Sequence, residues 1–242
     1  KFYFISGSGN KKTFTKNNLY KISKSLKSEQ NKFNIVLCGG DTTFSNKLSF
    51  TITSMGYTNK IIYRNKARLN DDIYVTGNLG DSYLGLKILS NKINIKKKDK
   101  LFFTDKYYKP ELPLSLTKYL LKFANTSIDV SDGLIDDLSK MINSQNLSFH
   151  LFEKKIPVSN KLSNLIKNQR LNKINLISNG DDYQVLFTAN VNKTRIIQNA
   201  SKTTGIKITK IGKIVSGKDR SLIFDEKGKQ IQAKSKGYIH QF

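Results

Sequence analysis

Residues 127–138 read SIDVSDGLIDDL, and this stretch decides the fold class. Ser127 to Val130 fit a short strand, and the turn Ser131-Asp132-Gly133 follows it. After the turn, apolar residues recur at the i, i+3, i+4, i+7 spacing of an amphipathic helix. The sequence therefore predicts a strand, a tight turn and a helix in succession. The apolar positions of the helix are Leu134, Ile135, Leu138, Met141 and Ile142.

The alternation of strands and helices extends in both directions from this stretch. Between Lys47 and Met55 the residues alternate, with Leu48, Phe50 and Ile52 on one face, as expected of a half-buried strand. Such strands suit antiparallel pairing, so the pattern predicts an α+β fold rather than a doubly wound parallel sheet. Further strands are expected at residues 34–38, 73–76, 149–152, 183–188, 206–214 and 221–224, and helices at 19–29, 81–91, 112–123, around 162–166 and around 196–200.

The domain organisation follows from length and from one linker. The chain has 242 residues, of which 38% are hydrophobic, so it can bury a sizeable core. Gly56 to Arg64 is the only plausible linker, and we expect one domain over residues 1–62 and a second over residues 63–242. The sequence opens at Lys1 directly into KFYFISGSG, which is typical of a domain interior, so we expect the first domain to be incomplete.

The chain is strongly basic, with 42 Lys and Arg against 18 Asp and Glu and a formal net charge of +24. Lysine makes up most of the basic residues and is scattered along the whole chain. Arginine is the residue whose planar fork best suits phosphates and bases. The composition therefore disfavours nucleic-acid binding as the main role. The arginines are Arg64, Arg68, Arg170, Arg195 and Arg220.

Cysteine use and hydropathy indicate the compartment. Cys38, the single cysteine, cannot form an internal disulfide or a cysteine-rich zinc site, and on its apolar strand we expect a small core residue. No stretch approaches the roughly 20 apolar residues that cross a bilayer. We therefore expect a cytoplasmic protein with no membrane partner. The run Lys96 to Lys98 with Lys100 is expected to be a solvated loop.

The most informative residues are the few carboxylates that lie beside glycine. Asp129 closes a strand and Asp132 opens a helix, so both carboxylates can point at one location, where a nucleotide-bound Mg²⁺ would fit. Capping of the helix by Ser131 or Asp132 explains the same pattern. The residues alone leave these two interpretations even.

Three further acidic loops allow similar alternatives. In GGDTT, residues 39–43, the glycines let the backbone approach a phosphate and Asp41 can reach its metal, but in isolation a tight turn is favoured. Residues 77–81 can present amides at a helix N-terminus to an anion, although they lack the P-loop lysine. The third loop, residues 179–183, precedes a strand.

The residues that are scarce also limit the chemistry. His150 and His240 are the only histidines, and His150 lies in an alternating strand, so a Ser-His-Asp or zinc site is disfavoured. Carboxylates, glycines and basic side chains remain. They favour phosphoryl transfer, in which positioning and charge neutralisation provide most of the catalysis.

Five blocks in chain order resemble the thiamine-monophosphate kinase family. Each block is weak alone, but their order over nearly the whole chain makes the match specific. The family phosphorylates thiamine monophosphate with ATP and Mg²⁺, so the resemblance implies this activity and a two-domain fold like that of aminoimidazole ribonucleotide synthetase. The blocks are GGDTT (39–43), RNKARLNDDIYVTGNLGDSYLGL (64–86), SIDVSDGLIDDL (127–138), NGDDYQVLFT (179–188) and GYIH (237–240).

The resemblance also assigns site residues. It implies that Asp41 and Asp129 are Mg²⁺ ligands and that Asp132 joins the same cluster. The transfer is expected to be direct from ATP to the substrate phosphate, so no catalytic side chain is assigned. The residues implied to contact ATP are Gly40, Asp41, Arg64 and Ser131.

On the substrate side, the resemblance implies that Asp181 and Tyr238 bind thiamine monophosphate. A carboxylate and an aromatic ring suit a cationic thiazolium. Asp181 stands where the family carries a glutamate, and the aspartate side chain is shorter by one methylene group. Asn179 and Asn70 replace family glycines, and asparagine is the residue that best tolerates positive φ after glycine. Gln241 interrupts the usual GYxHF ending.

The front of the chain departs most from the family. Family members carry a further N-terminal segment with acidic metal ligands and part of the substrate site. We therefore expect this chain to be a fragment with little or no kinase activity, and residues 1–62 to form a homodimer contact. The alternatives are another ATP-dependent synthetase of the same superfamily and, less favoured, a basic nucleic-acid-binding module.

Overall fold

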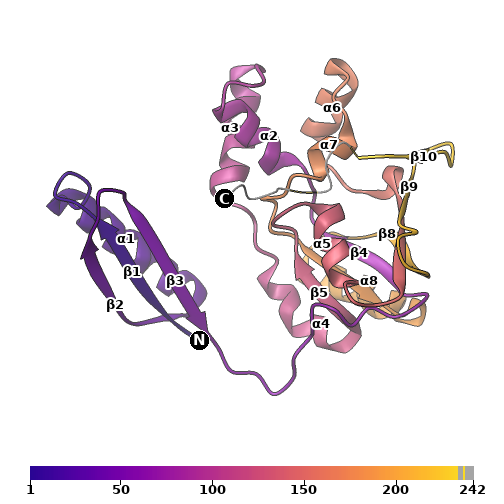
Figure 1. Ribbon diagram of the computed structural model, residues 1–242, viewed down its shortest axis with the longest axis horizontal. Helices are drawn as coiled ribbons and strands as arrows, with labels where there is room; N and C mark the ends of the chain where they lie inside the picture. The colour runs from indigo at the N-terminus through magenta and orange to yellow at the C-terminus, as the bar shows by residue number, and fades with distance from the viewer. Residues whose placement is uncertain (234–236, 238–242) are drawn as a thin grey trace. The chain divides into compact units, whose positions relative to one another are not determined.

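The computed structural model describes residues 1–233 and Gly237. The chain divides into two compact units, Lys1–Lys60 and Ile61–Phe242, and each is considered by itself (Figure 1). Within residues 1–233, no helix combines the length and the apolar character that a membrane span requires.

The first unit is a three-stranded sheet with one helix. Its strand order is β2-β1-β3, in which β1 (Phe2–Gly9) pairs parallel with β2 (Val36–Phe44) and antiparallel with β3 (Ser49–Met55). The helix α1 (Lys16–Phe33) connects β1 to β2, as a parallel pair requires. It begins where the Thr15 side chain accepts a hydrogen bond from the Asn18 amide.

Two sequence predictions for the first unit are wrong. Residues 39–43 are not a turn but part of β2, because parallel pairing with β1 carries the strand through the glycines. A Cβ at Gly40 would lie 1.9 Å from the Ile5 carbonyl oxygen, so the glycine allows this close strand contact. Cys38 is exposed rather than in a core, because α1 has no buried residue and little of the sheet is covered.

The strand at residues 49–55 is also exposed along its whole length, not half-buried. Its alternating sequence is correct for a strand, but the apolar side chains Phe50 and Ile52 remain 44% and 55% exposed. The first unit therefore presents apolar side chains to its surroundings.

The second unit is built on a seven-stranded sheet of order β10-β9-β6-β8-β4-β7-β5. All neighbouring pairs are antiparallel except β6 with β9, which confirms the α+β prediction. The strands are β4 (Asp72–Thr76), β5 (Ala124–Asp129), β6 (Leu147–Phe152), β7 (Val185–Ala189), β8 (Ile208–Ser216), β9 (Leu222–Phe224) and β10 (Gln230–Ile231).

Helices cover both faces of this sheet, because successive side chains of its strands point to opposite faces and apolar residues lie on both. In β4, Ile73 and Val75 pack in a core with α5 (Leu134–Met141) and α7 (Lys173–Ile177). Tyr74, between them, faces the opposite core. Full burial of such side chains contributes about 1.5–3 kcal/mol each relative to exposure. The opposite core is formed with α4 (Thr117–Phe123) and α8 (Thr194–Thr204).

A third apolar cluster lies among helices α2 (Asp81–Leu89), α3 (Lys97–Tyr108) and α6 (Asn160–Gln169). The run Lys96 to Lys98 with Lys100 is therefore not a loop, because it forms the first turn of α3. Burial of Phe103 against α2 fixes this helix, and a Cβ at Gly85 would lie 2.2 Å from the Phe103 carbonyl oxygen. The sequence analysis missed α3 and the short α7.

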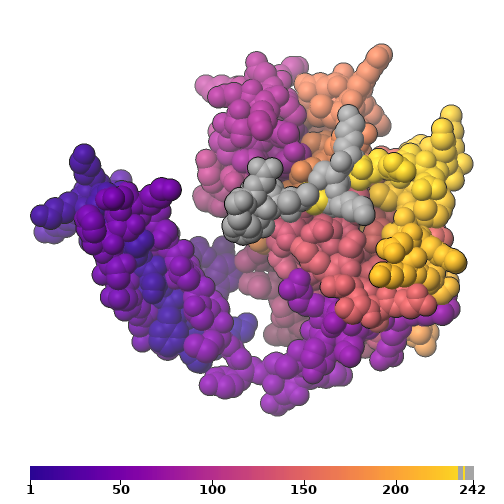
Figure 2. All heavy atoms as spheres, in the orientation of Figure 1, coloured from indigo at the N-terminus to yellow at the C-terminus, as the bar shows by residue number. Residues whose placement is uncertain are grey.

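Residues 112–123 form two helical pieces rather than one helix. Pro113 precedes a 3₁₀ turn, Leu114–Leu116, and α4 starts only at Thr117. In Figure 2 the segment around α5 lies at the centre of one face of this unit, beside the C-terminal hairpin.

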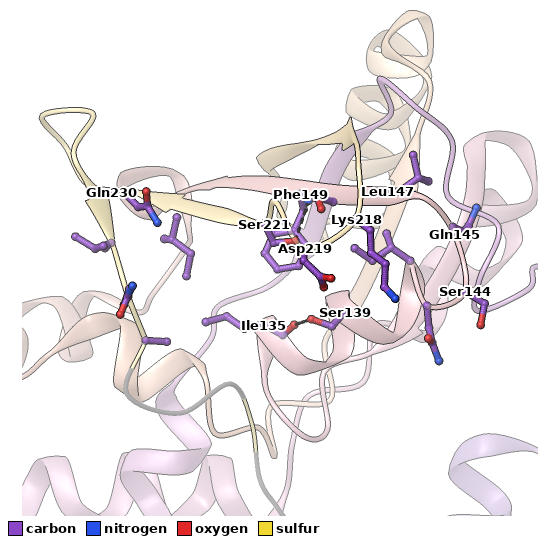
Figure 3. A pocket seen from close by; sticks show the side chains of 17 residues that line it. Ile135, Ser139, Ser144, Gln145, Leu147, Phe149, Lys218, Asp219, Ser221 and Gln230 are labelled. Atoms are coloured by element: carbon purple, nitrogen blue, oxygen red, sulfur yellow. Dashed lines mark hydrogen bonds between the residues drawn. The ribbon is translucent and has the colours of Figure 1, made fainter.

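A cavity of about 560 Å³ lies between α5 and the strands β6, β9 and β10. Figure 3 shows Ile135 and Ser139 of α5 on one side of it and Phe149 and Ser221 on another. None of the predicted site residues within the described part of the chain lines this cavity. The candidate site lies instead at the turn before α5.

Candidate active site

Backbone hydrogen bonds join the loop after β5 to the loop before β7. The Val130 amide donates to the Gln184 carbonyl at 2.8 Å, and the Tyr183 amide donates back to Val130 at 2.9 Å. Beyond them, the Asp181 amide donates to the Ser131 carbonyl at 3.0 Å. The antiparallel pairing of β5 with β7 thus continues past both strand ends. It brings the SDG block and the NGDDY block together.

Gly180 makes this close approach possible. Its φ of +70° lies in the left-handed region, and a Cβ there would lie 2.0 Å from the Ser131 carbonyl oxygen. Asp181 follows with a φ of 61°. The sequence block NGDD can therefore fold back against Ser131 only because it contains this glycine.

The carboxylates at this end of the sheet act on one another. Burial raises the pKa of Asp181, and the neighbouring charge of Asp132 raises it further. Burial also raises the pKa of Tyr183, and the charges of Asp181 and Asp129 add to that shift. Like charges placed together favour a cation between them. The structure thus gathers three predicted site residues, Asp129, Asp132 and Asp181, around Tyr183.

The turn before α5 is held by a residue that the sequence analysis missed. Asp137 Oδ2 accepts hydrogen bonds from the Ser131, Asp132 and Gly133 amides at 3.0, 3.0 and 3.1 Å. Of the two interpretations that the sequence leaves open for this turn, capping by Ser131 or Asp132 does not occur, because the N-cap residue is Gly133 and no side chain caps from that position. An acidic residue in the first helical turn is the signal that could have found Asp137.

Asp137 is buried, and burial raises its pKa against the opposing effect of Lys140 and these amides. Lys140 Nζ lies 3.0 Å from Asp137 Oδ1, 2.8 Å from Asp136 Oδ2 and 2.5 Å from Asp132 Oδ2. The three aspartates have oxygens within 4.8 Å of one another. Burial works to lower the pKa of Lys140, but hydrogen bonds to Asp132, Asp136 and Asp137 outweigh it and raise that pKa. Asp129 is not part of this group and is exposed at the end of β5.

Asp182 organises a second turn, at the start of α2. Its Oδ2 accepts the Gly80 amide at 2.7 Å and its Oδ1 accepts the Ser82 amide at 3.3 Å. Burial, with a smaller contribution from Asp81, raises the pKa of Asp182 to about 7. Within residues 77–81 the Gly80 amide is therefore not free to bind an anion, because Asp182 accepts its hydrogen bond.

Asp81 is the second buried carboxyl of this turn. Burial raises its pKa to about 6, although the Ser159 hydroxyl donates a hydrogen bond to Oδ1 at 2.7 Å. Asp81, Asp182 and Ser159 line a cavity of about 240 Å³ together with Lys106 and Gln184. The two carboxyls link α2, the loop before β7 and the start of α6.

The remaining predicted site residues lie elsewhere. Gly40 and Asp41 are in β2 of the first unit, where the Asp41 carboxylate accepts the Thr42 amide at 2.7 Å. Arg64 is exposed in a turn near the start of the second unit. Tyr238 lies outside the described residues, but Gly237 before it lies against α5, since a Cβ there would be 2.5 Å from Asp136 Cβ.

The chain is similar in sequence to known proteins. No family model matches the chain. The thiamine-monophosphate kinase of Buchnera aphidicola (subsp. Acyrthosiphon pisum) is 36% identical over 229 residues, which are 92% of this chain and 69% of that protein. The chain belongs to the thiamine-monophosphate kinase family. A second thiamine-monophosphate kinase, from Leptospira interrogans, is 33% identical over 80% of this chain and 60% of its own length. The chain thus spans about two-thirds of these relatives.

Solved structures confirm the fold. The thiamine-monophosphate kinase of Aquifex aeolicus has a TM-score of 0.78 and 25% identity, and the match covers 96% of this chain and 75% of that one. A structure described as AaThiL complexed with AMPPCP and TMP has a TM-score of 0.79 and 24% identity, with 99% and 74% covered. The Escherichia coli hydrogenase maturation protein HypE, 15% identical with a TM-score of 0.77 and 97% and 73% covered, shows the same fold. The expected aminoimidazole ribonucleotide synthetase-like fold of a thiamine-monophosphate kinase is thereby confirmed.

Proposed function

We propose that this chain carries out the ATP- and Mg²⁺-dependent phosphorylation of thiamine monophosphate to thiamine diphosphate. The observation that carries the proposal is the backbone pairing of residues 130–131 with 181–184, which gathers Asp129, Asp132 and Asp181. The kinase relatives, and the neighbour bound to AMPPCP and TMP, support the choice of substrates. The match covers 69% and 60% of these two relatives, so their activity is proposed, not established, for this chain.

The donor set fits Mg²⁺. Carboxylate oxygens are the protein ligands that Mg²⁺ prefers, in sets of one or two completed by water and phosphate. Asp129 is exposed, and among the described residues its carboxylate has no hydrogen-bond or ion-pair partner. Asp129 and Asp132 would hold the ion, and Asp41 of the first unit is proposed as a Mg²⁺ ligand from the family resemblance alone. When bound, the ion supplies positive charge that offsets the charge of the transferring phosphoryl group.

The other proposed residues bind and orient the two substrates. Gly40 is proposed to contact the nucleotide through its backbone, since its Cβ position is taken up by the Ile5 carbonyl oxygen. The exposed guanidinium of Arg64 matches phosphate oxygens with its paired donors. The Ser131 hydroxyl lies beside the metal ligands in sequence and is half-buried. Transfer is direct, from ATP to the substrate phosphate, so these residues contribute position and charge rather than a covalent intermediate.

Asp181 and Tyr238 are proposed to bind the thiamine part of the substrate. The positive φ of Asp181 and the contact of its amide with Ser131 fix its backbone next to the SDG turn. A cationic thiazolium there would be attracted by the carboxylate, whose raised pKa reflects burial and the nearby charge of Asp132.

We also propose that the protein is a cytoplasmic homodimer whose contact includes the first unit. Apolar side chains of its sheet are exposed, with Val36 57%, Ile52 55% and Phe44 80% exposed. Such a surface favours association with a second copy. Sedimentation velocity should give a dimer, and Ile52→Lys should shift it towards the monomer; a monomer before substitution contradicts this part of the proposal.

The test measures thiamine diphosphate formed from thiamine monophosphate, ATP and Mg²⁺ by the purified protein. Asp129→Asn should lower kcat/KM by about 100-fold or more, because a metal ligand is lost. Asp105→Asn, an exposed aspartate of α3, is the matched control and should have no effect. A folded protein without turnover contradicts the proposal and favours a sister synthetase.

A further inference from the structure

Lys140 occupies the middle of a carboxylate group that could otherwise hold a metal ion. Its Nζ lies between 2.5 and 3.0 Å from one oxygen each of Asp132, Asp136 and Asp137. The oxygens of these three aspartates lie within 4.8 Å of one another. Asp136 and Asp137 have the i, i+4 and i, i+3 spacings of ordinary helical ion pairs. The arrangement goes beyond such pairs because Asp132 lies before the helix.

We propose that Lys140 acts as a built-in cation that excludes a divalent metal ion from the Asp132–Asp136–Asp137 group and thereby sets how many metal ions the site binds. The inference rests on the proposed function in one respect, since Asp132 is one of the proposed Mg²⁺ ligands. Lys140 is a positioning residue in this scheme. It acts through Asp132 and has no assigned contact with substrate.

One carboxylate of the group, that of Asp137, is already committed on one side. Asp137 Oδ2 is taken by the three amides of the SDG turn, so its Oδ1 is the oxygen left for a cation. Asp132 and Asp136 are half-exposed. Gly237 lies close to both, since a Cβ built on it would be 3.0 Å from the Asp132 carbonyl oxygen. Three carboxylates held this close need positive charge, and the ammonium of Lys140 supplies it without a metal.

Exclusion follows from charge and space together. A divalent ion in this group would have to share the same three oxygens with an ammonium that already hydrogen-bonds to all of them. Removing the ammonium while keeping the aliphatic stem restores three oxygens of the kind that hard cations bind. Lys140→Met makes that change with little loss of packing, since the lysine stem is about as long as the methionine side chain.

The experiment counts Mn²⁺ ions bound to the purified protein by calorimetry and by electron paramagnetic resonance, without nucleotide or substrate. The Lys140→Met variant should bind one more Mn²⁺ per chain than the unsubstituted protein. Lys140→Arg should restore the original number. The double variant Lys140→Met with Asp136→Asn should lose the additional ion, which locates it in this group.

A matched control is available on α6. Lys161 pairs with the single carboxylate of Asp99 at 2.9 Å, and its side chain is 36% exposed against 33% for Lys140. Lys161→Met should leave the Mn²⁺ number unchanged. Circular dichroism of each variant checks folding, and Lys140→Gln replaces Lys140→Met if the latter does not fold.

An unchanged Mn²⁺ number in folded Lys140→Met and Lys140→Gln overturns the inference. Because the readout is a difference in bound ions, it does not depend on turnover. A protein that gains an ion in Lys140→Met but has no kinase activity would contradict the proposed function and keep this inference. An active enzyme whose Lys140→Met variant gains no ion would support the proposed function and overturn this inference.

Discussion

Asp182 Oδ2 lies 2.7 Å from the amide nitrogen of Gly80, a residue 102 positions earlier in the chain. The carboxyl is buried and also accepts the Ser82 amide, so it takes the place at the start of α2 that a bound anion would take. The contact ties the loop that carries Asp181 to helix α2. The position of a proposed substrate residue thus depends on a buried carboxyl that is itself not part of the site.

Folding stability should fall between pH 5 and pH 8 because of this carboxyl and Asp81. Their pKa values of about 7 and about 6 exceed the ordinary value of 3.8, so the folded chain holds these protons more tightly than the unfolded chain. Their contribution is fully present below pH 4 and is lost as the pH rises through 6 and 7. Urea unfolding across this range measures it. A stability that stays level from pH 5 to pH 8 would disagree.

Asp182→Asn should flatten this pH dependence. The amide cannot ionise, and its NH₂ group would face one of the two amides that the carboxyl accepts. We expect a loss of about 1–3 kcal/mol at pH 5 and a smaller loss at pH 8. Unfolding of both proteins at the two pH values gives the comparison, and equal losses would count against the assigned pKa shift.

Gly180→Ala should be strongly destabilising. The new Cβ would meet the Ser131 carbonyl oxygen at 2.0 Å in addition to the strain of a positive φ. We expect a loss of more than about 2 kcal/mol on thermal unfolding. Gly205→Ala is the matched control, because its φ of +69° is almost the same and nothing lies within 4 Å of its Cβ position. The control should lose only about 1 kcal/mol; similar losses at both glycines would show that the loop contact is unimportant.

Asp137→Ala should loosen the SDG turn. Three amides lose their acceptor in a buried place, and we expect a loss of about 2–4 kcal/mol in the free energy of unfolding. Asp136→Ala removes only an ion pair of a half-exposed side chain and should cost less than about 1 kcal/mol. Denaturant titrations of the two variants, done side by side, would refute the role of Asp137 if the order were reversed.

Asp181→Asn should weaken binding of thiamine monophosphate selectively. Asparagine tolerates the positive φ at this position, so the backbone is preserved while the charge is removed. The KM for thiamine monophosphate should rise by roughly 10-fold, which corresponds to about 1.4 kcal/mol, and the KM for ATP should not change. A parallel rise in both constants would place Asp181 in a structural role instead.

Local patterns predict most of the elements on which the sheet and its two cores depend, but not β10 or α7. The SDG block folds as the strand, turn and helix that its spacing indicates, and α5 begins at Leu134. The sequence does not predict helix α3, because Phe103 is its only buried residue and the helix therefore has little amphipathic pattern. Gly39-Gly40 is a turn signal and predicts a turn at residues 39–43, whereas in the structure Gly40 allows close strand pairing.

The candidate site was predictable only for those of its residues that belong to recognisable sequence blocks. Asp132 and Asp181 stand beside glycines, and Asp129 belongs to the same block as Asp132, so all three are predicted from the sequence. Asp137 and Asp182 look in sequence like solvent-exposed charges, and their roles depend on amides that the fold brings to them. The role of Lys140 likewise appears only in three dimensions, since Asp132 lies outside its helix.

The turn at the start of α2 and the SDG turn each have backbone amides that an internal aspartate accepts, Asp182 in the first and Asp137 in the second. In the proposed site, nucleotide phosphates at the SDG turn would meet a surface that is already anionic and whose three amides are occupied. Such a surface would repel uncomplexed ATP but not ATP that carries its divalent ion. The proposed function therefore predicts that the turn selects the metal-bound form of the nucleotide and that inorganic sulfate or phosphate competes poorly for it.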